Sequence, residues 1–337
     1  MTDPASMRNR QTTGLRILVT GTGGFIGQPL CRSLLEKGYR VTGTVRSEND
    51  GSPCPGVDVK ATGDLETFDD WESLLKDVDA VIHLAARVHV MGKSGEGALS
   101  GYRAVNVTVT EKLLRAAAAA GVRRFVFVSS VKAVGEGGPV SYSEASVARP
   151  TDPYGISKLE AEKVVTAVGK ENSLETVILR LPLVYGPGVR ANFFRLMKLV
   201  DRGIPLPFAG IDNRRSMIFL ENLVDVLQVC LDHREAAGKV FMVSDGEDLS
   251  TPGLIMKLSA AMHKKSRLLR FPLWSLRLAG ALTGKGPEIE RLLGSLPVDT
   301  GKIRNELEWI PPYTVEQGIA RTVAWYLLLS RDTLLRS

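Results

Sequence analysis

Short apolar runs alternate with amphipathic stretches through the first half of the chain. Runs rich in Val and Ile predict buried strands, and segments with apolar residues at helical spacing lie between them. The predicted strands cover 16–21, 40–45, 57–61, 80–86, 124–130 and 176–186, and the predicted helices cover 25–37, 69–76, 100–120 and 153–168. Strands that alternate with helices indicate right-handed βαβ units. We therefore predict an α/β fold, a doubly wound parallel sheet, over 15–185.

The alternation weakens after about residue 186, where Pro and Gly recur. This pattern predicts a smaller α/β lobe over 186–337 that binds the substrate, with some segments returning to the sheet. Residues 1–14 are polar and are expected to form a disordered leader, with Met7 as a possible natural start. The apolar run 271–282 contains Arg277 and is too short to span a bilayer. We expect it to pack under a lid, with resting on a membrane surface as the minor alternative.

Composition is typical of a soluble globular protein, with 44% hydrophobic and 24% charged residues. The net charge of +6 is not gathered in a dense block, so we expect no nucleic-acid arm and no nucleic-acid partner. A mild positive balance also suits an anionic small molecule. The three cysteines, Cys31, Cys54 and Cys230, form no CxxC pair, which argues against a disulfide framework or a metal site. We expect a cytoplasmic protein without stable membrane insertion.

A glycine-rich loop follows the first predicted strand and opens the first helix. Gly21, Gly24 and Gly27 form the pattern GxxGxxG. In such loops the first glycine permits a tight turn, the second admits a pyrophosphate, and the third lets the helix pack closely on the sheet. Free amides at the helix N-terminus add an anion site. The alternative is a turn that merely needs glycine, but the order strand, loop and helix favours dinucleotide binding and a Rossmann-type sheet.

The end of the second predicted strand bears on the choice of dinucleotide. NAD-binding loops usually place a carboxylate there for the ribose hydroxyls. This chain has Arg46, whose guanidinium suits the 2′-phosphate of NADP. In the alternative interpretation Arg46 is a solvated loop residue, and Glu48 or Asp50 binds the ribose of NAD. We favour NADP(H), with NAD(H) as the alternative.

The segment DPYGISK predicts a helix start that carries possible acid–base chemistry. Asp152 suits the N-cap and Pro153 the first helical position, and Tyr154 and Lys158 share one helix face. A tyrosine with a pKa of about 10 needs a shift of about 3 units to act near neutrality. We expect the lysine ammonium and the helix terminus to lower the pKa of Tyr154. Ser129 and Ser130 end a strand at the sheet edge where ligands bind.

Together, Gly21–Gly27, Ser130 and the YGISK segment resemble the extended short-chain dehydrogenase/reductase family, in its nucleotide-sugar epimerase/dehydratase group. The resemblance runs from Leu15 to Tyr326. It implies that Tyr154 donates and accepts the proton, that Lys158 lowers its pKa and holds the nicotinamide ribose, and that Ser130 binds the reacting oxygen. Ser130 is preferred to its neighbour because it stands five residues ahead of Gly135, as the Ser or Thr of the family does.

The same resemblance assigns the remaining cofactor contacts. The GDL segment at 63–65 is similar to the part that contacts adenine, and HLAAR at 83–87 to the strand end along the cofactor. His83 is therefore expected to be a buried strand residue and not a catalyst. The expected cofactor-binding residues are Gly21, Gly24, Phe25, Ile26, Gly27, Arg46, Asp64, Leu65, Leu84, Ala85, Ala86, Tyr154 and Lys158.

On the substrate side, the resemblance places Asn192 at the start of a helix and Arg215 at the diphosphate of a nucleotide sugar. The alternative for Arg215 is a surface salt bridge. Dehydratases of the family carry an Asp-Glu pair directly after the catalytic Ser or Thr, whereas this chain has Val131 and Lys132. Elimination of water is therefore not expected. Leu183 stands where many relatives have an asparagine that binds the sugar diphosphate.

Stretches such as HLAARVHVMG and LPLVYGPGVRANFFRLM are most similar to bacterial enzymes of O-antigen and capsule synthesis. This similarity implies NADPH-dependent reduction of the C4 keto group of a UDP-2-acetamido-2,6-dideoxy-hexulose. The alternative is an NAD-dependent UDP-hexose 4-epimerase acting on UDP-glucose or UDP-GlcNAc. A non-catalytic NADP-sensing module is a third hypothesis, which retention of both Tyr154 and Lys158 argues against. In the family, the helices at 100–120 and 153–168 form a homodimer, which we also expect here.

Overall fold

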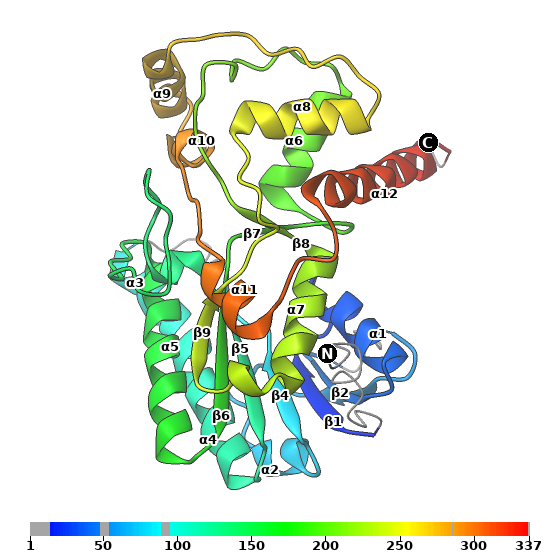
Figure 1. The fold of residues 1–337 in the computed structure, drawn as a ribbon, viewed down its shortest axis with the longest axis vertical. Helices are drawn as coiled ribbons and strands as arrows, with labels where there is room; N and C mark the ends of the chain where they lie inside the picture. Colours follow the sequence, from blue (N-terminus) through cyan, green and yellow to red (C-terminus); the bar gives the residue numbers. More distant parts are fainter. Residues whose placement is uncertain (1–13, 48–53, 89–94, 285, 336–337) are drawn as a thin grey trace, which may run out of the picture.

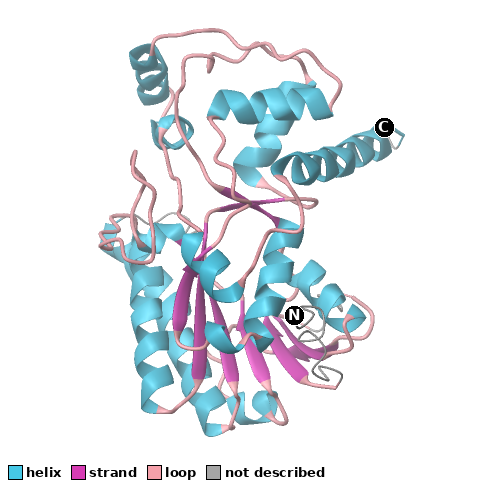
Figure 2. Ribbon diagram, in the orientation of Figure 1, coloured by secondary structure: helices cyan, strands magenta, loops and turns pink. Residues whose placement is uncertain are grey.

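A parallel sheet with helices on both faces forms the larger layer of the molecule, and the second lobe lies beyond one end of its strands (Figures 1 and 2). The computed structural model describes residues 14–47, 54–88, 95–284 and 286–335. Its seven-stranded sheet has the order β3-β2-β1-β4-β5-β6-β9, and all its strands are parallel. The strands are β1 (Arg16–Thr20), β2 (Arg40–Val45), β3 (Asp58–Ala61), β4 (Ala80–His83), β5 (Arg124–Ser130), β6 (Glu175–Leu181) and β9 (Lys239–Met242). The predicted Rossmann-type sheet is confirmed.

The strand order reverses at β1, which pairs with β2 on one side and β4 on the other. A crevice opens at the carboxyl ends of the strands wherever the order reverses in this way. Alternate residues of β1 pack into cores on opposite faces of the sheet, with Ile17 and Val19 on one face and Leu18 on the other. Burial on both faces explains why β1 is continuously apolar in sequence.

The helices around the sheet include the four predicted ones, together with helices at 220–232 and 301–307 that were not predicted. They are α1 (Gly27–Glu36), α2 (Trp71–Leu75), α3 (Gly95–Arg103), α4 (Thr110–Ala119), α5 (Pro153–Glu171), α7 (Leu220–Asp232) and α11 (Gly301–Leu307). A π-helical segment, Ala104–Val109, joins α3 to α4, so the predicted helix at 100–120 starts earlier than expected. The short helical turns Val131–Ala133 and Arg234–Ala236 follow β5 and α7.

The predicted strand at 176–186 is wrong in one respect, because the chain leaves the main sheet at Pro182. Beyond it, β7 (Leu183–Tyr185) pairs with β8 (Met217–Phe219) in a separate two-stranded sheet. Proline has no N–H to donate to a sheet ladder, so a break there is physically reasonable. The strand predicted at 80–86 likewise ends earlier, at His83.

The second lobe is built around the β7–β8 ribbon. Its helices are α6 (Ala191–Asp201), α8 (Thr251–Ala261), α9 (Leu273–Leu282), α10 (Gly286–Leu293) and α12 (Val315–Leu335). Its core contains Tyr185, Phe193 and Met197. By contrast, α7 and β9 return to the sheet layer, as the sequence analysis allowed for some late segments. The expected leader lies almost wholly outside the described residues.

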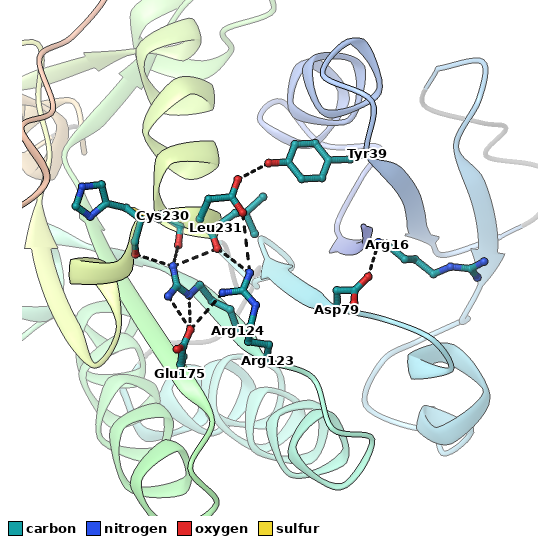
Figure 3. A network of polar contacts seen from close by, with 10 residues as sticks. Arg16, Tyr39, Asp79, Arg123, Arg124, Glu175, Cys230 and Leu231 are labelled. Atoms are coloured by element: carbon teal, nitrogen blue, oxygen red, sulfur yellow. Dashed lines mark hydrogen bonds and ion pairs between the residues drawn. The ribbon is translucent and has the colours of Figure 1, made fainter. Parts of the chain in front are cut away.

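A polar cluster fastens the end of α7 to the sheet (Figure 3). The buried Arg124 of β5 donates to the carbonyls of Cys230 and Leu231 at 3.0 and 3.1 Å and to the Glu175 carboxylate at 2.6 Å. Tyr39 donates to the Asp232 carboxylate at the same helix end. A cation beside the last carbonyls of a helix stabilises that end. This cluster therefore explains how a helix late in the chain is held against the first half.

The buried thiols and the buried histidine have structural environments. All three cysteines are buried, and burial raises the pKa of Cys31 and of Cys230 to about 12, which leaves both thiols protonated. The ring nitrogens of His83 lie 2.7 and 3.0 Å from the hydroxyls of Thr20 and Thr110, and burial lowers its pKa to about 3. The expectation that His83 is a buried strand residue is confirmed. Among the described residues, no cluster of three or more potential metal ligands occurs.

Candidate active site

A cleft of about 390 Å³ opens at the carboxyl ends of β1, β2, β3 and β4, where the strand order reverses. Its lining residues are Gly21, Thr44, Val45, Arg46, Thr62, Gly63, Asp64, Leu65, Ala85, Ala86, Arg87, Val88 and Val105. Gly21 of the glycine loop is thus brought together from separate strands with the GDL segment and with Ala85, Ala86 and Arg87. The other predicted cofactor residues do not line this cleft: Gly24, Phe25, Ile26, Gly27, Leu84, Tyr154 and Lys158. The sequence analysis did not predict three of the lining residues: Thr44, Thr62 and Val105. They reach the cleft only because the fold brings the ends of neighbouring strands and helices together.

The glycine loop has the geometry of a phosphate cradle. Gly21 has a φ of +74°, and a Cβ there would lie 3.1 Å from the backbone nitrogen of Ala85. A Cβ at Gly27 would lie 2.4 Å from the carbonyl oxygen of Gly21, so the start of α1 approaches the turn too closely for any side chain. Gly24 donates to the same carbonyl at 3.1 Å. No side chain caps α1 at Ile26. The amide of Gln28 donates to the carbonyl of Gly24 at 3.2 Å, whereas the amides of Phe25 and Ile26 have no backbone acceptor in the described part of the chain and can face an anion.

Three of the predicted cofactor residues direct their side chains into the protein cores. Phe25 packs against the core of the second lobe, and Ile26 and Leu84 pack against the core of the sheet. The hydroxyl of Thr20 accepts hydrogen bonds from the amides of Leu84 and Ala85 at 3.2 and 3.1 Å, which fixes the chain beyond β4.

Arg46 is an exposed residue of the cleft wall just beyond β2. Its guanidinium makes no ion pair with a described carboxylate. Glu48 and Asp50, the alternative ribose-binding residues, lie outside the described residues. At the end of β2, the described cleft wall therefore consists of the Arg46 guanidinium together with the side chains of Thr44 and Val45.

Ser130 and Tyr154 meet beyond the glycine loop, where β5 ends and α5 begins. The Tyr154 hydroxyl is hydrogen-bonded to Ser130. Asp152 caps α5 by accepting from the amide of Tyr154 at 2.9 Å, and Pro153 occupies the first turn, as predicted. Ser129 points to the other face of the strand and donates to Glu162 at 2.5 Å. The structure therefore supports Ser130, and not Ser129, as the partner of the phenol.

Lys158 lies one turn further along α5 and is almost completely buried, with 2% of its surface exposed. Its ammonium donates to the carbonyl of Val128 at 2.7 Å and lies 4.1 Å from the centre of the Phe127 ring. Burial lowers the pKa of Lys158 to about 7, against which the nearby Glu162 carboxylate raises it. The lysine is thus poised to change charge near neutrality.

The expected lowering of the Tyr154 pKa does not occur in this structure. Burial raises the pKa of Tyr154 to about 12, and the charge of Asp152 adds to the rise, whereas the hydrogen bond with Ser130 opposes it. The expectation assumed an ammonium directed at the phenol, but Lys158 donates to Val128. Desolvation therefore exceeds the effect of the neighbouring donors, and the phenol is protonated at neutral pH.

Two buried polar networks support this site and were not predicted. In the first, Asn106 of the π-helical segment accepts from the amide of Arg87 at 2.8 Å and donates to Ser157 at 3.0 Å. Ser157 in turn donates to the carbonyl of Tyr154 at 2.8 Å. This network joins the cleft wall to the first turn of α5. Its only signal in the sequence is a polar Asn106 inside an otherwise amphipathic helical stretch.

The second network lies beneath the lysine. Arg180 of β6 makes a two-pronged contact with Glu162, with its shortest distance at 2.7 Å, and Ser129 donates to the same carboxylate. Both charged side chains are more than nine-tenths buried. Glu162 stands one helical turn after Lys158, so it shares that face of α5. The pair thus places a buried carboxylate next to the lysine and ties α5 to two strands.

The predicted substrate residues lie in the second lobe and its connections. Arg215 is half-buried and donates to the carbonyls of Arg291 and Gly294, and burial together with the charge of Arg291 lowers its pKa. No described carboxylate pairs with Arg215, so the salt-bridge alternative is not observed. Asn192 is exposed in the first turn of α6, whose N-terminus has no side-chain cap. Leu183 is 45% exposed.

The residues after Ser130 are unsuited to acid–base elimination. Val131 is buried and apolar, with 2% exposure. Lys132 forms ion pairs with Asp152 and Glu136, so its charge is directed to the helix cap. The sequence-based exclusion of dehydratase chemistry agrees with this geometry.

A cofactor cleft at a sheet switch point, followed by a Ser-Tyr-Lys group at the next strand end, defines a dehydrogenase-type enzyme of the extended short-chain class. The family profile described as the NAD dependent epimerase/dehydratase family matches residues 17–244, and the chain belongs to this family. It is an enzyme of the NAD(P)-dependent extended short-chain dehydrogenase/reductase type.

Several relatives are similar over nearly the whole chain. A UDP-glucose 4-epimerase from Vibrio cholerae is 42% identical over 92% of this chain and 95% of its own length. An N-acetyl-α-D-glucosaminyl-diphospho-ditrans,octacis-undecaprenol 4-epimerase from Escherichia coli O157:H7 is 25% identical over 92% and 94%. Among solved structures, MoeE5 in complex with UDP-glucose and NAD has a TM-score of 0.76 at 25% identity, covering 95% of this chain and 99% of its own. The UDP-glucuronic acid 4-epimerase from Bacillus cereus, also at 0.76, is 24% identical over 94% and 100% and supports the fold alone.

Proposed function

We propose that this protein is an NAD-dependent UDP-hexose 4-epimerase, with Tyr154 as its acid–base group. The observation that carries the proposal is the pair of Ser130 and Tyr154 beside the buried Lys158, at the end of β5, the strand next to β4, whose own end lines the cleft. The 42% identity to the epimerase from Vibrio cholerae supports the reaction, and NAD in complex with MoeE5 supports the cofactor. We had favoured NADPH-dependent reduction from sequence, and the relatives support the epimerase alternative better.

The residues present fit a bound dinucleotide. The glycines at 21 and 27 leave space that a Cβ would fill, and the uncapped start of α1 offers amides to a pyrophosphate. NAD, when bound, supplies a group that takes up and returns a hydride. Tyr154, in its phenolate form, would remove the proton of the sugar hydroxyl at C4 and later return it, while Ser130 would donate a hydrogen bond to the same oxygen. The ammonium of Lys158 stabilises the phenolate form of Tyr154.

The second lobe would hold the nucleotide diphosphate. Arg215 has its guanidinium anchored by backbone carbonyls and has no described carboxylate partner, so its charge is available to an anion. The uncapped N-terminus of α6 at Asn192 adds amide donors. We propose both as diphosphate contacts. We also propose a homodimer formed through α3, α4 and α5, which light scattering tests. A cytoplasmic location is a further proposal, which cell fractionation tests.

The function is tested by incubating the purified protein with UDP-glucose or UDP-GlcNAc without added cofactor. Formation of the C4 epimer, followed by proton NMR, is the expected result. Tyr154→Phe should reduce turnover by at least about a hundredfold while cofactor binding is retained. Epimerisation at the wild-type rate by Tyr154→Phe would contradict the assigned role.

One observation favours a second candidate, the NADPH-dependent 4-ketoreductase of a UDP-2-acetamido-2,6-dideoxy-hexulose. Arg46 lies in the cleft wall with no described anionic partner, where its fork could hold a 2′-phosphate. This reaction consumes NADPH only when the 4-keto sugar is present, and it yields no epimer of UDP-glucose. In that case Arg46→Ala should raise KM for NADPH about tenfold or more and leave KM for NADH nearly unchanged.

A further inference from the structure

An exposed apolar stripe follows the outer face of α9, at the outer end of the second lobe (Figure 1). Trp274, Leu278 and Leu282 are 68%, 52% and 79% exposed. They stand four residues apart and therefore share one face of the helix. Phe271, just before α9, adds a side chain that is 45% exposed. The expectation that the run 271–282 packs under a lid is wrong for this face.

The opposite face of α9 already has its partner. Leu276 is buried at 7% exposure, and a Cβ at Gly280 would lie 2.9 Å from the side chain of Ile289 in α10. The helix is therefore apolar on both the face that packs and the face that is open. Arg277, between these two faces, pairs with Glu290 of α10. Five large exposed side chains within twelve residues, Leu273 at 39% included, thus point to a surface that is covered in the working protein.

The segment from residue 262 to residue 286 carries charges of one sign, and its acidic partner near α9, within the described part of the chain, is Glu290 of α10, which pairs with Arg277. Between residues 262 and 286 the sequence has no Asp or Glu. Lys265, Arg267 and Arg270 are exposed, and none of them forms an ion pair with the described part of the chain. The segment that carries them runs along the outer end of the lobe from α8 to α9, with its backbone held by Leu206 (Figure 1).

We propose that this apolar–basic patch, consisting of Phe271, Trp274, Leu278 and Leu282 with the three exposed cations, rests on an anionic lipid bilayer. Aromatic and aliphatic residues flanked by Lys and Arg are the composition of interfacial helices, and cations near an anionic surface add attraction. A symmetric contact between two copies would instead oppose like charges, because such an interface uses the same patch twice. None of the described helices is long and apolar enough to cross a membrane, which restricts this contact to the surface.

Vesicle co-sedimentation of the full chain tests the proposal. The probes are vesicles of phosphatidylglycerol mixed with phosphatidylethanolamine, compared with vesicles of phosphatidylcholine alone. We expect binding to the anionic vesicles that weakens with added salt, and a blue shift of tryptophan emission. The blue shift should disappear in Trp274→Ser, because Trp71 and Trp309 are buried at 7% and 4% exposure and Trp325 is half-buried beside Phe194, on another part of the lobe.

The triple variant Trp274→Ser/Leu278→Ser/Leu282→Ser should bind at least about tenfold more weakly, as expected for three lost apolar contacts. The matched control is Val147→Ser/Ile310→Ser/Leu328→Ser, whose side chains are similarly exposed, at 74%, 77% and 63%, on other parts of the surface. Equal loss in both variants would overturn the proposal. Equal binding to neutral and anionic vesicles would also overturn it. So would a wild-type protein that binds no vesicles but forms an oligomer, if the triple variant at 274, 278 and 282 no longer forms that oligomer.

Discussion

The buried ammonium of Lys158 is expected to destabilise the folded protein, and Lys158→Met tests this directly. Methionine has a similar length and volume but carries no charge, so it removes the desolvation cost without opening a large cavity. Loss of the Lys158 ammonium should abolish activity. It should also make the cofactor-free protein more stable near neutral pH. A residue that costs stability where it sits is common in active sites.

The magnitude follows from the pKa of Lys158, which burial lowers from 10.5 to about 7. The unfolded chain therefore binds more protons than the folded one between these two values, and stability rises with pH across that window. The destabilisation is about 5 kcal/mol below pH 7, about 4 kcal/mol at pH 7 and about 2 kcal/mol at pH 9. The lost hydrogen bond to Val128 offsets about 1 kcal/mol of the gain. Lys158→Met should thus be more stable by about 3 kcal/mol at pH 7 and by about 1 kcal/mol at pH 9.

Urea unfolding followed by circular dichroism at pH 7 and at pH 9 provides the measurement. Lys163→Met, an exposed lysine on the same helix, is the matched control and should change stability by less than about 0.5 kcal/mol at either pH. The reasoning fails if Lys158→Met is less stable than the wild type at pH 7. It fails equally if the difference between the two proteins is the same at both pH values.

Three further substitutions test other parts of the structure. Gly27→Ala should weaken cofactor binding at least about tenfold in calorimetry, because its Cβ would meet a carbonyl oxygen at 2.4 Å. The control is Gly23→Ala, whose Cβ has open space, and it should bind the cofactor normally. Glu162→Gln leaves the buried Arg180 charge unpaired and should lower the free energy of unfolding in urea by about 3 kcal/mol. Because Glu162 raises the pKa of Lys158, the same variant should shift the lysine-dependent limb of the pH–rate profile toward lower pH. An unchanged profile would exclude Glu162 as a support of the ammonium. Arg124→Met should lower stability by about 3 kcal/mol, and an unchanged urea midpoint would refute its role at the end of α7.

Features of the site that depend on local sequence were predicted well. The glycine turn, the cap at Asp152 and the pairing of Tyr154 with Lys158 on one helix face all follow from short-range rules of backbone geometry. The parallel sheet follows from the alternation of strands and helices. Even the choice between Ser129 and Ser130, made from a resemblance, has a local physical basis in the alternation of side chains along β5.

Features that depend on distant segments were not predicted. The strand β9 joins β6 from sixty residues further along the chain, and no local pattern marks which late segment returns to the sheet. Asn106 and Glu162 acquire their roles only because the fold brings the cleft wall, α5 and β6 together. Their sequence context is an ordinary helix. Buried polar networks of this kind are a property of tertiary packing, which residue spacing alone does not encode.

The largest difference between expectation and structure concerns the acid–base pair itself. From sequence, an ammonium four residues from a phenol should lower the pKa of Tyr154, but burial raises that pKa to about 12 and lowers the pKa of Lys158 to about 7. Both shifts favour the neutral forms, as desolvation always does. For Tyr154 to ionise, Lys158 must be protonated and its ammonium must be directed at the phenol. The ammonium must then give up its hydrogen bond to the carbonyl of Val128. The buried Glu162 carboxylate favours that cation. If Tyr154 is the acid–base group, as proposed, we expect its proton transfer to depend on the position of the lysine side chain.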